Sequence, residues 1–330
     1  MVQSADEDLP SRLRALLAEG RYREVLDLHR HDSASNLPPQ PGVALVVATA
    51  ATRLGGLVEA EALASDALGR FRQRADDDGQ MRCLNLLGAI AYERGQLDEA
   101  SSRFAASLDL GRRLDDLQST ARASNNLASV AYLRGRVEES RGLFREAQLA
   151  YQRLGDRRGL AETYHNLGIV ARESAELEDA GHNAEQAVRH AELARDPALM
   201  ALAMAGQAET AVADGEFDLA SEELDRSKAL AVQAGDEVGV AETNRVRSEL
   251  CLNRGEPALA LQTAEWGRAT AERFGSTQLQ GECAALAMRA ARALGRTAEA
   301  VRLHAEAERL FIGLGAVLHL QRLRQDPIHQ

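Results

Sequence analysis

Three polar side chains with suitable chemistry for holding a peptide recur at a spacing of 40 residues: Asn85, Asn125 and His165. A side-chain amide can donate and accept a hydrogen bond at once, which is what the backbone of an extended peptide requires. Amides spaced evenly along a surface could therefore hold a peptide whatever its side chains. Tyr92 and Tyr132, also 40 residues apart, would add flat and rigid contact area. The alternative interpretation is that Asn85 and Asn125 are simply hydrated.

Residues suited to catalysis or to metal binding are not arranged for either. No two of the eight histidines lie four residues apart with a carboxylate between them, as in zinc-binding helices. The three cysteines, Cys83, Cys251 and Cys283, are widely separated and odd in number, which indicates buried thiols. Paired acids such as Asp98 and Glu99 fit the first turns of helices, where negative charge is favourable. We therefore predict no enzymatic activity, no metal and no cofactor.

These residues lie in a repeat of 40 residues. Glycines share one phase of the repeat, with Ala175 as the exception: Gly55, Gly95, Gly135, Gly215, Gly255 and Gly295. Alanines follow five residues later, with Ser140 as the exception: Ala60, Ala100, Ala180, Ala220, Ala260 and Ala300. A fixed period of this length is typical of a stack of one supersecondary unit, so we expect function on an extended surface.

Each repeat reads as a helix, a short turn, a second helix and a longer turn. Residues that can cap a helix N-terminus recur in a third phase: Asp76, Asp116, Asp156, Asp196, Asp236 and Ser276. Small residues form two columns, which would let neighbouring helices approach closely. The first is Ala51, Ala91, Ala131, Ala171, Ala211, Cys251 and Ala291, and the second is Ala67, Ser107, Ala147, Ala187, Ser227, Gly267 and Ala307.

The ends of the chain depart from the repeat. We predict a disordered N-terminus at residues 1–10, a helix hairpin at 11–30, a Pro/Ser-rich loop at 31–42, a regular array at 43–314, and a capping helix with a tail at 315–330. In the last segment, Leu318, Leu320 and Leu323 would cover the final repeat, as an open stack requires. Arg322 and Arg324 would face water.

The composition narrows the range of partners. The chain has 330 residues and a net charge of −11, whereas nucleic-acid-binding domains are usually basic. The acidic start has no apolar core typical of a signal peptide, and no stretch approaches the length of a membrane span. We expect a cytoplasmic protein that binds neither nucleic acid nor membrane.

The repeat resembles the tetratricopeptide repeat (TPR). The resemblance rests on Asn85-Leu86-Leu87-Gly88 followed by Gly95 and Ala100, on Asn126-Leu127-Ala128 followed by Gly135, on Asn166-Leu167-Gly168 followed by Ala180, and on Phe104 and Phe144 in second helices. The unit is longer than the family's 34 residues. It is similar to the long repeats of bacterial transcriptional regulators, signalling ATPases and kinesin light chains. The resemblance implies an all-α, right-handed superhelical solenoid of about eight antiparallel helix hairpins with a C-terminal capping helix.

The resemblance also implies that first helices line a concave face. It places the predicted contacts for a peptide or protein partner there: Arg82, Asn85, Tyr92, Arg122, Asn125, Tyr132, His165, Arg172, Glu209 and Arg245. Arginines and glutamates are similarly frequent at these phases, and two interpretations stay open. The charges pair with one another, or they recognise a ligand of mixed charge.

Trp266, the single tryptophan, falls at an outward phase of the repeat. It either fills a local gap or marks a convex surface for a partner or for self-association. The leading functional hypothesis is a non-enzymatic module, a bacterial scaffold or regulatory adaptor, that binds a peptide or partner protein in the concave groove. The alternative is a regulatory sensor whose superhelix changes pitch when a signalling peptide or small molecule binds.

Overall fold

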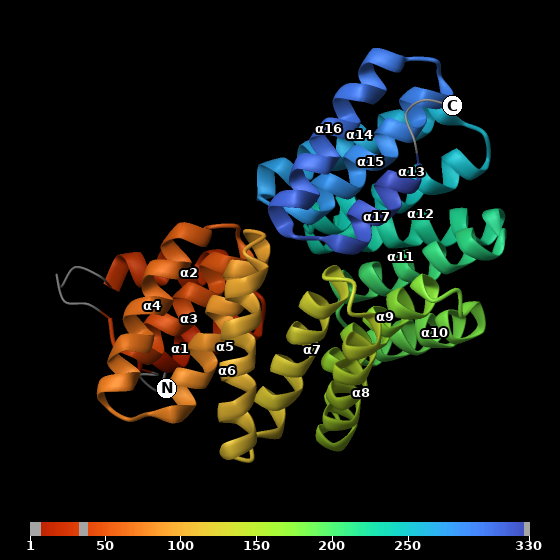
Figure 1. Ribbon diagram of the computed structural model, residues 1–330. Helices are drawn as coiled ribbons and strands as arrows, with labels where there is room; N and C mark the ends of the chain where they lie inside the picture. Colours follow the sequence, from red (N-terminus) through yellow and green to blue (C-terminus); the bar gives the residue numbers. More distant parts are fainter. Residues whose placement is uncertain (1–7, 33–38, 327–330) are drawn as a thin grey trace, which may run out of the picture. The chain divides into compact units, whose positions relative to one another are not determined.

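The computed structural model describes residues 8–32 and 39–326, and within these ranges it contains seventeen α-helices and no strand (Figure 1). The first helices are α1 Leu9–Ala18, α2 Tyr22–Asp32, α3 Pro41–Arg53, α4 Leu57–Gln73, α5 Asp77–Glu93, α6 Leu97–Arg113, α7 Leu117–Leu133 and α8 Val137–Leu154. They are followed by α9 Arg157–Glu173, α10 Leu177–Ala194, α11 Pro197–Asp214, α12 Phe217–Ala234, α13 Glu237–Asn253, α14 Pro257–Phe274, α15 Thr277–Ala293, α16 Thr297–Leu314 and α17 Val317–Gln325. Eight hairpins and one final helix confirm the predicted all-α solenoid.

The helices belong to two compact units. Unit 1 comprises residues 1–92 and 98–119, and unit 2 comprises residues 93–97 and 120–330. In unit 1, the first hairpin packs on α3 through a small core that includes Leu13, Val25 and Val47. Unit 2 contains α8 to α17 and most of α7, and it holds most of the residues discussed below.

The predicted cap residues start the helices that follow the longer turns. The side-chain oxygen of Asp156 accepts a hydrogen bond from the backbone N–H of Gly159 at 3.0 Å, which satisfies a donor that a helix start leaves unpaired. Asp76, Asp116, Asp196 and Asp236 accept equivalent bonds. Ser276 occupies the same place without a side-chain cap bond.

Left-handed backbone explains the glycine phase. All six glycines of that phase have positive φ, for example +75° at Gly255. Ala175 adopts the same conformation with φ of +57°, although a Cβ makes it unfavourable. The glycines therefore recur every 40 residues because each repeat has the same left-handed turn.

Within unit 2, the odd-numbered helices form a continuous inner layer. Helix α9 packs on α11, α11 on α13 and α13 on α15, while α10, α12 and α14 each pack against the odd-numbered helices on either side. Both columns of small residues are buried along the whole chain, as predicted. Close helix approach at these columns keeps consecutive odd-numbered helices within side-chain reach of one another.

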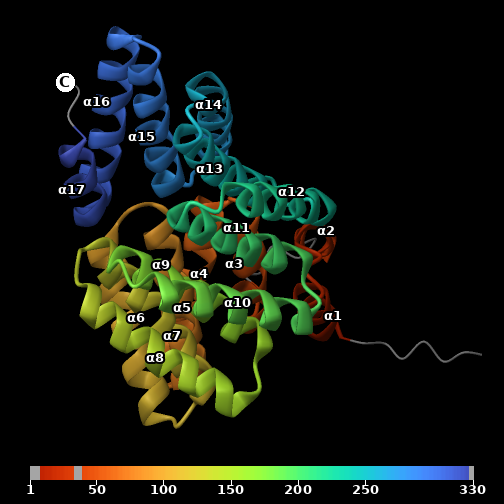
Figure 2. The same cartoon turned by 90° about the vertical axis from the view of Figure 1, so that its right-hand side faces the viewer.

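The C-terminal helix α17 covers the last hairpin of unit 2, beside α16 (Figure 2). Leu323 belongs to the core formed by α13 to α16, with Leu320 packed against that core, and Leu318 is also buried. This is the capping role expected for the segment.

The predicted domain boundaries remain predictions, with three differences in detail. Helix α1 begins at Leu9, inside the segment expected to be disordered, because Asp8 caps it through the N–H of Ser11. Helix α2 continues to Asp32 and α3 starts at Pro41, so helix enters both ends of the predicted loop. Residues 1–7, 33–38 and 327–330 lie outside the described residues, so the N-terminal disorder expected there, half of the predicted loop and the end of the tail are not described. Across the described ranges, no helix combines the length and apolarity that crossing a membrane requires.

Candidate functional site on the inner helices

The inner layer of unit 2 carries a set of charged and polar side chains, which we call the inner face. It consists of Asn125 and Tyr132 on α7, His165, Arg172 and Glu173 on α9, Glu209 on α11, Glu242, Arg245 and Glu249 on α13, Glu282 on α15, and His319 and Arg322 on α17. Because successive odd-numbered helices pack together, side chains from neighbouring repeats meet there.

The first link in this set joins α9 to α11. Arg172 pairs with Glu209 at 2.5 Å and donates a second hydrogen bond to the hydroxyl of Thr210 at 3.1 Å. The side chains of Arg172 and Glu209 are 12% and 20% exposed, so the pair is largely shielded from water. A shielded charge-assisted bond is stronger than one on an open surface.

Arg245 contacts more carboxylates than the other arginines of the inner face described here. Its guanidinium pairs with Glu209 of α11 at 3.2 Å, with Glu242 of its own helix at 2.6 Å and with Glu282 of α15 at 3.3 Å. Its side chain is 11% exposed. One cation therefore compensates carboxylates from three successive repeats, because the planar guanidinium offers donors in several directions.

The set continues to the capping helix. His319 of α17 lies 2.9 Å from Glu282 through its Nε2 atom, and its ring packs against Phe311 with 4.9 Å between ring centroids. Gln278 also donates to Glu282, at 2.8 Å. Ion pairs thus link α9 to α15, and the contact between Glu282 and His319 extends the set to α17.

Burial and pairing shift the pKa values of these groups in opposite directions. Burial would raise the pKa of Glu282, but His319 and Arg245 lower it to about 2. Burial raises the pKa of Glu249, and the nearby Glu209 adds to that increase. Glu242 also has a raised pKa, chiefly through burial. The inner face of α11 to α15 therefore has more carboxylates than its arginines compensate.

Asn125 and His165 are both engaged with the next helix. Asn125 is 8% exposed, and its Oδ1 atom accepts hydrogen bonds from the hydroxyl of Thr163 at 3.2 Å and from the amide of Asn166 at 3.4 Å. The ring of His165 packs against Gly206, where a Cβ would lie 2.6 Å from the Nδ1 atom. Burial, followed by the charge of Arg172, lowers the pKa of His165 to about 4, so the ring is neutral near pH 7.

The predicted contacts fall into two groups. The structure brings Asn125, Tyr132, His165, Arg172, Glu209 and Arg245 together on the inner face of unit 2. Arg82, Asn85 and Tyr92 belong to α5 in unit 1, where Arg82 is exposed and pairs with Asp78 one turn earlier at 3.0 Å. Arg122 lies at the exposed surface of α7. Of the two interpretations of groove charge, the contacts among α9, α11, α13 and α15 show internal pairing.

Two inner-face residues of α17 were missed by the sequence analysis, His319 and Arg322. The side chain of Arg322 is exposed, as expected, but it also pairs with Glu173 and donates to the hydroxyl of Tyr132. The repeat contains a signal for it, because Arg322 follows Glu242 and Glu282 at the same 40-residue phase. No comparable signal marks His319, since Leu279 and Gly239 precede it at its phase.

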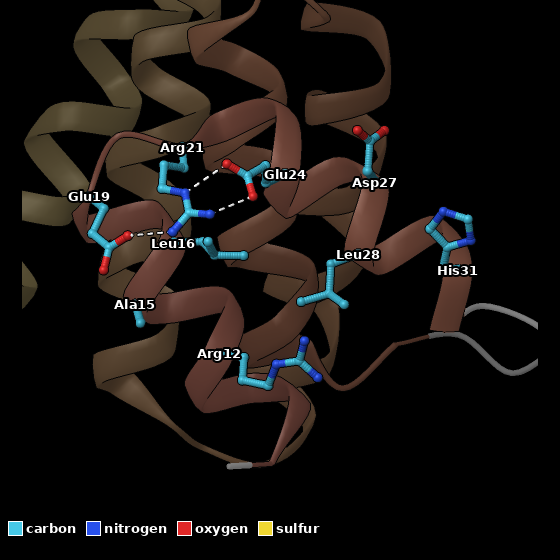
Figure 3. Close-up of a pocket in the computed structure, with 9 residues that line it drawn as sticks. All are labelled: Arg12, Ala15, Leu16, Glu19, Arg21, Glu24, Asp27, Leu28 and His31. Atoms are coloured by element: carbon cyan, nitrogen blue, oxygen red, sulfur yellow. Dashed lines mark hydrogen bonds and ion pairs between the residues drawn. The ribbon is translucent and has the colours of Figure 1, made fainter. Parts of the chain in front are cut away.

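Two other surface features lie outside the inner face. A hollow of about 570 Å³ between α1 and α2 is lined by Arg12, Ala15, Leu16, Glu19, Arg21, Glu24, Asp27, Leu28 and His31 (Figure 3). At its rim Arg21 is paired with Glu19 and Glu24 of the same hairpin. Trp266 on α14 is 44% exposed. Over the described ranges, no three His, Cys, Asp or Glu side chains come together as metal ligands would.

Comparisons with known proteins agree with this architecture. The tetratricopeptide-repeat family model matches residues 119–192. No curated protein sequence matches the chain. A crystal structure of a Rap protein complexed with competence and sporulation factor aligns with a TM-score of 0.76 and 14% identity, covering 94% of this chain and 89% of the Rap chain.

Two further structures have similar folds. The Rap conjugation gene regulator of plasmid pLS20, in complex with the Phr* peptide, aligns with a TM-score of 0.67 and 16% identity over 86% of this chain and 75% of that protein. A signal transduction ATPase with a tetratricopeptide repeat sensor from Pyrococcus horikoshii aligns with a TM-score of 0.56 and 12% identity. This chain is covered to 96%, but it spans only 48% of that ATPase.

Proposed function

On the premise of the tetratricopeptide-repeat match over residues 119–192 and of the shared fold, we propose that the inner face of unit 2 binds a peptide or a peptide-like segment of a partner protein, without catalysis. The observation that carries the proposal is the density of ordered polar side chains on five successive inner helices. A rigid polar surface loses little conformational entropy when it binds an extended chain.

Within this proposal the predicted residues have two different roles. Asn125, Tyr132 and His165, which carry no charge that must stay paired, are the proposed contacts for the ligand, although each also touches a neighbouring helix. Arg172, Glu209 and Arg245 are positioning residues, because their charges are already compensated by one another. Arg82, Asn85, Tyr92 and Arg122 remain predicted contacts on the sequence pattern alone.

The test is capture of binding partners from a lysate of the host. The full chain, the double variant Asn125→Ala/His165→Ala, and the outer-helix control Trp266→Ala are compared by mass spectrometry. We expect a protein or peptide that is lost with the double variant and kept by the wild type and Trp266→Ala. A partner kept by the double variant and lost with Trp266→Ala would instead place binding on the outer helices, and the melting temperature of each variant checks that it is folded.

A second candidate function is a regulator whose shape responds to the ligand. It is favoured by the likeness in fold to a Rap protein complexed with competence and sporulation factor and to a Rap conjugation gene regulator in complex with the Phr* peptide. The continuous set of polar contacts from α9 to α17 would transmit a change in one repeat to the next. Small-angle scattering with and without the captured ligand distinguishes the two functions, because a regulator changes its radius of gyration and a passive scaffold does not.

The bacterial and cytoplasmic setting that we expected from the sequence stays part of the proposal. A partner of protein or peptide nature fits the net charge of −11 better than a nucleic acid does. Self-association through Trp266 is retained as a proposal that a concentration series in analytical ultracentrifugation would test.

A further inference from the structure

Arg322 of α17 reaches residues of unit 2 that lie far away in the sequence. Its Nη2 atom pairs with the carboxylate of Glu173 on α9 and donates to the hydroxyl of Tyr132 on α7, 190 residues earlier, at 3.4 Å. The start of the same helix lies near the turn after α7, because a Cβ on Gly135 would be 3.5 Å from Val317. Helix α17 therefore contacts inner-face residues well beyond the hairpin that it caps.

Tyr132 and Glu173, which contact Arg322, form a small polar site. Tyr132 is 9% exposed and the side chain of Glu173 is 17% exposed. The Tyr132 hydroxyl donates to the Oε2 atom of Glu173 at 3.4 Å, so this oxygen and the carboxylate both face the arginine as acceptors. A carboxylate beside a phenolic oxygen suits the several N–H donors of a planar guanidinium.

Arg322 differs from the other arginines of the inner face in how firmly it is held. Arg172 and Arg245 are 12% and 11% exposed and are enclosed by partners from neighbouring repeats. The side chain of Arg322 is 53% exposed and reaches the site from the solvent side. An exposed ion pair contributes little stability, so Arg322 can leave without disrupting the core.

We propose that Tyr132 and Glu173 form a guanidinium-binding site that Arg322 fills from within the chain and that an arginine side chain of the bound peptide takes over. The proposal rests on the function proposed above, since it specifies one chemical group of the peptide ligand. Arg322 then competes with the arginine of the peptide for this site. A bound peptide releases α17 from α7 and α9, which weakens the contact between distant repeats.

The experiment uses the full chain and a pair of probes that differ in one charge. The probes are acetyl-Ala-Arg-Ala-amide and the same peptide with citrulline, the neutral isostere of arginine. Dissociation constants are measured by NMR titration for the wild type, Arg322→Gln, the double variant Arg322→Gln/Glu173→Gln, and the control Arg324→Gln. Arg324 is exposed on the same helix, so its removal changes the net charge equally.

Arg322→Gln is expected to bind the arginine probe about three- to fivefold more tightly than the wild type, as loss of an exposed ion pair predicts. Arg324→Gln should match the wild type, and the double variant should lose the gain. The citrulline probe should not distinguish the variants. Equal affinity of the arginine probe for Arg322→Gln and Arg324→Gln, or equal binding of the two probes to Arg322→Gln, would overturn the inference.

These outcomes separate the inference from the proposed function. If host partners are lost with Asn125→Ala/His165→Ala while the arginine probe shows no preference for Arg322→Gln, the guanidinium site is wrong and the function stands. If the probe binds as expected while host partners depend on Trp266, the site is supported and the proposed function fails.

Discussion

One position of the repeat is occupied by Asn85 in α5 of unit 1 and by Arg245 in α13 of unit 2. On α5, the nearby Arg82 is exposed and pairs with Asp78 of its own helix. On α13, Arg245 is buried and joins carboxylates from α11, α13 and α15. The repeat fixes where a side chain lies, and the residues of adjacent repeats decide which charges it contacts.

The largest expected difference between these regions is in stability. Arg245→Met removes the cation shared by Glu209, Glu242 and Glu282, so each of these partly buried carboxylates loses one of its charge partners. We expect a loss of about 3–5 kcal/mol in the free energy of unfolding, measured by urea denaturation. Arg82→Met, the matched change in unit 1, should stay within about 0.5 kcal/mol of wild type. Equal effects of the two changes would contradict the comparison.

A second difference is in how stability depends on pH. The test is His165→Asn, because asparagine occupies this position in the two preceding repeats. The pKa of His165 falls from 6.5 to about 4 in the folded chain, so the unfolded chain takes up the proton first as the pH drops. The wild type should therefore lose stability between pH 6.5 and pH 4, on the order of 3 kcal/mol more than His165→Asn. Urea denaturation across this range measures the difference.

The other charged groups near His165 do not change the difference in stability between the wild type and His165→Asn. Arg172, Glu209 and Arg245 are the charges that act on its ring, and both chains contain them. The raised pKa values of Glu242 and Glu249 act in the opposite direction, because stability gained on protonation grows as the pH falls. Their contribution cancels to first order when the two chains are compared. Parallel curves for wild type and His165→Asn would show that the ring is not held neutral by burial.

A third test asks what the two units share. Ala91 on α5 and Ala131 on α7 belong to the same buried column, at 4% and 0% exposure. Ala91→Phe and Ala131→Phe should each cost about 1–3 kcal/mol through overpacking, as shifts in melting temperature would report. Similar losses would show that the scaffold is uniform while the inner face varies, whereas an unchanged melting temperature for either variant would refute its placement in the column.

The smallest expected effect concerns the turns. Ala175→Gly should stabilise the chain by about 0.5–1 kcal/mol, because Ala175 has a positive φ of 57°. Gly255→Ala should destabilise it by a similar amount, since Gly255 has φ of 75° and open space where the Cβ would be. The midpoints of urea denaturation of both variants show whether each change stabilises or destabilises the chain. A loss of stability in Ala175→Gly would mean that its Cβ makes contacts that outweigh the strain.

The fold was predictable because its determinants are local and periodic. Asp156 as a cap, Gly255 at a left-handed turn and Ala131 in a packing column each act within one repeat and recur in the sequence. The ion pairs of Arg245 were harder to foresee, because they depend on which residues adjacent repeats bring together. No polar residue occupies the position of His319 in the two preceding repeats, so the repeat could not predict its contact with Glu282. The contact of Arg322 with Tyr132 joins repeats that are not neighbours in the chain.

The central claim is that ligand binding occurs on the inner helices of unit 2. Hydrogen exchange of the full chain, with and without the partner captured from the host, tests it most directly. The account predicts slower exchange in α7 and α9 on binding and unchanged exchange in α14 around Trp266. Protection confined to α14, with α7 and α9 unchanged, would contradict it.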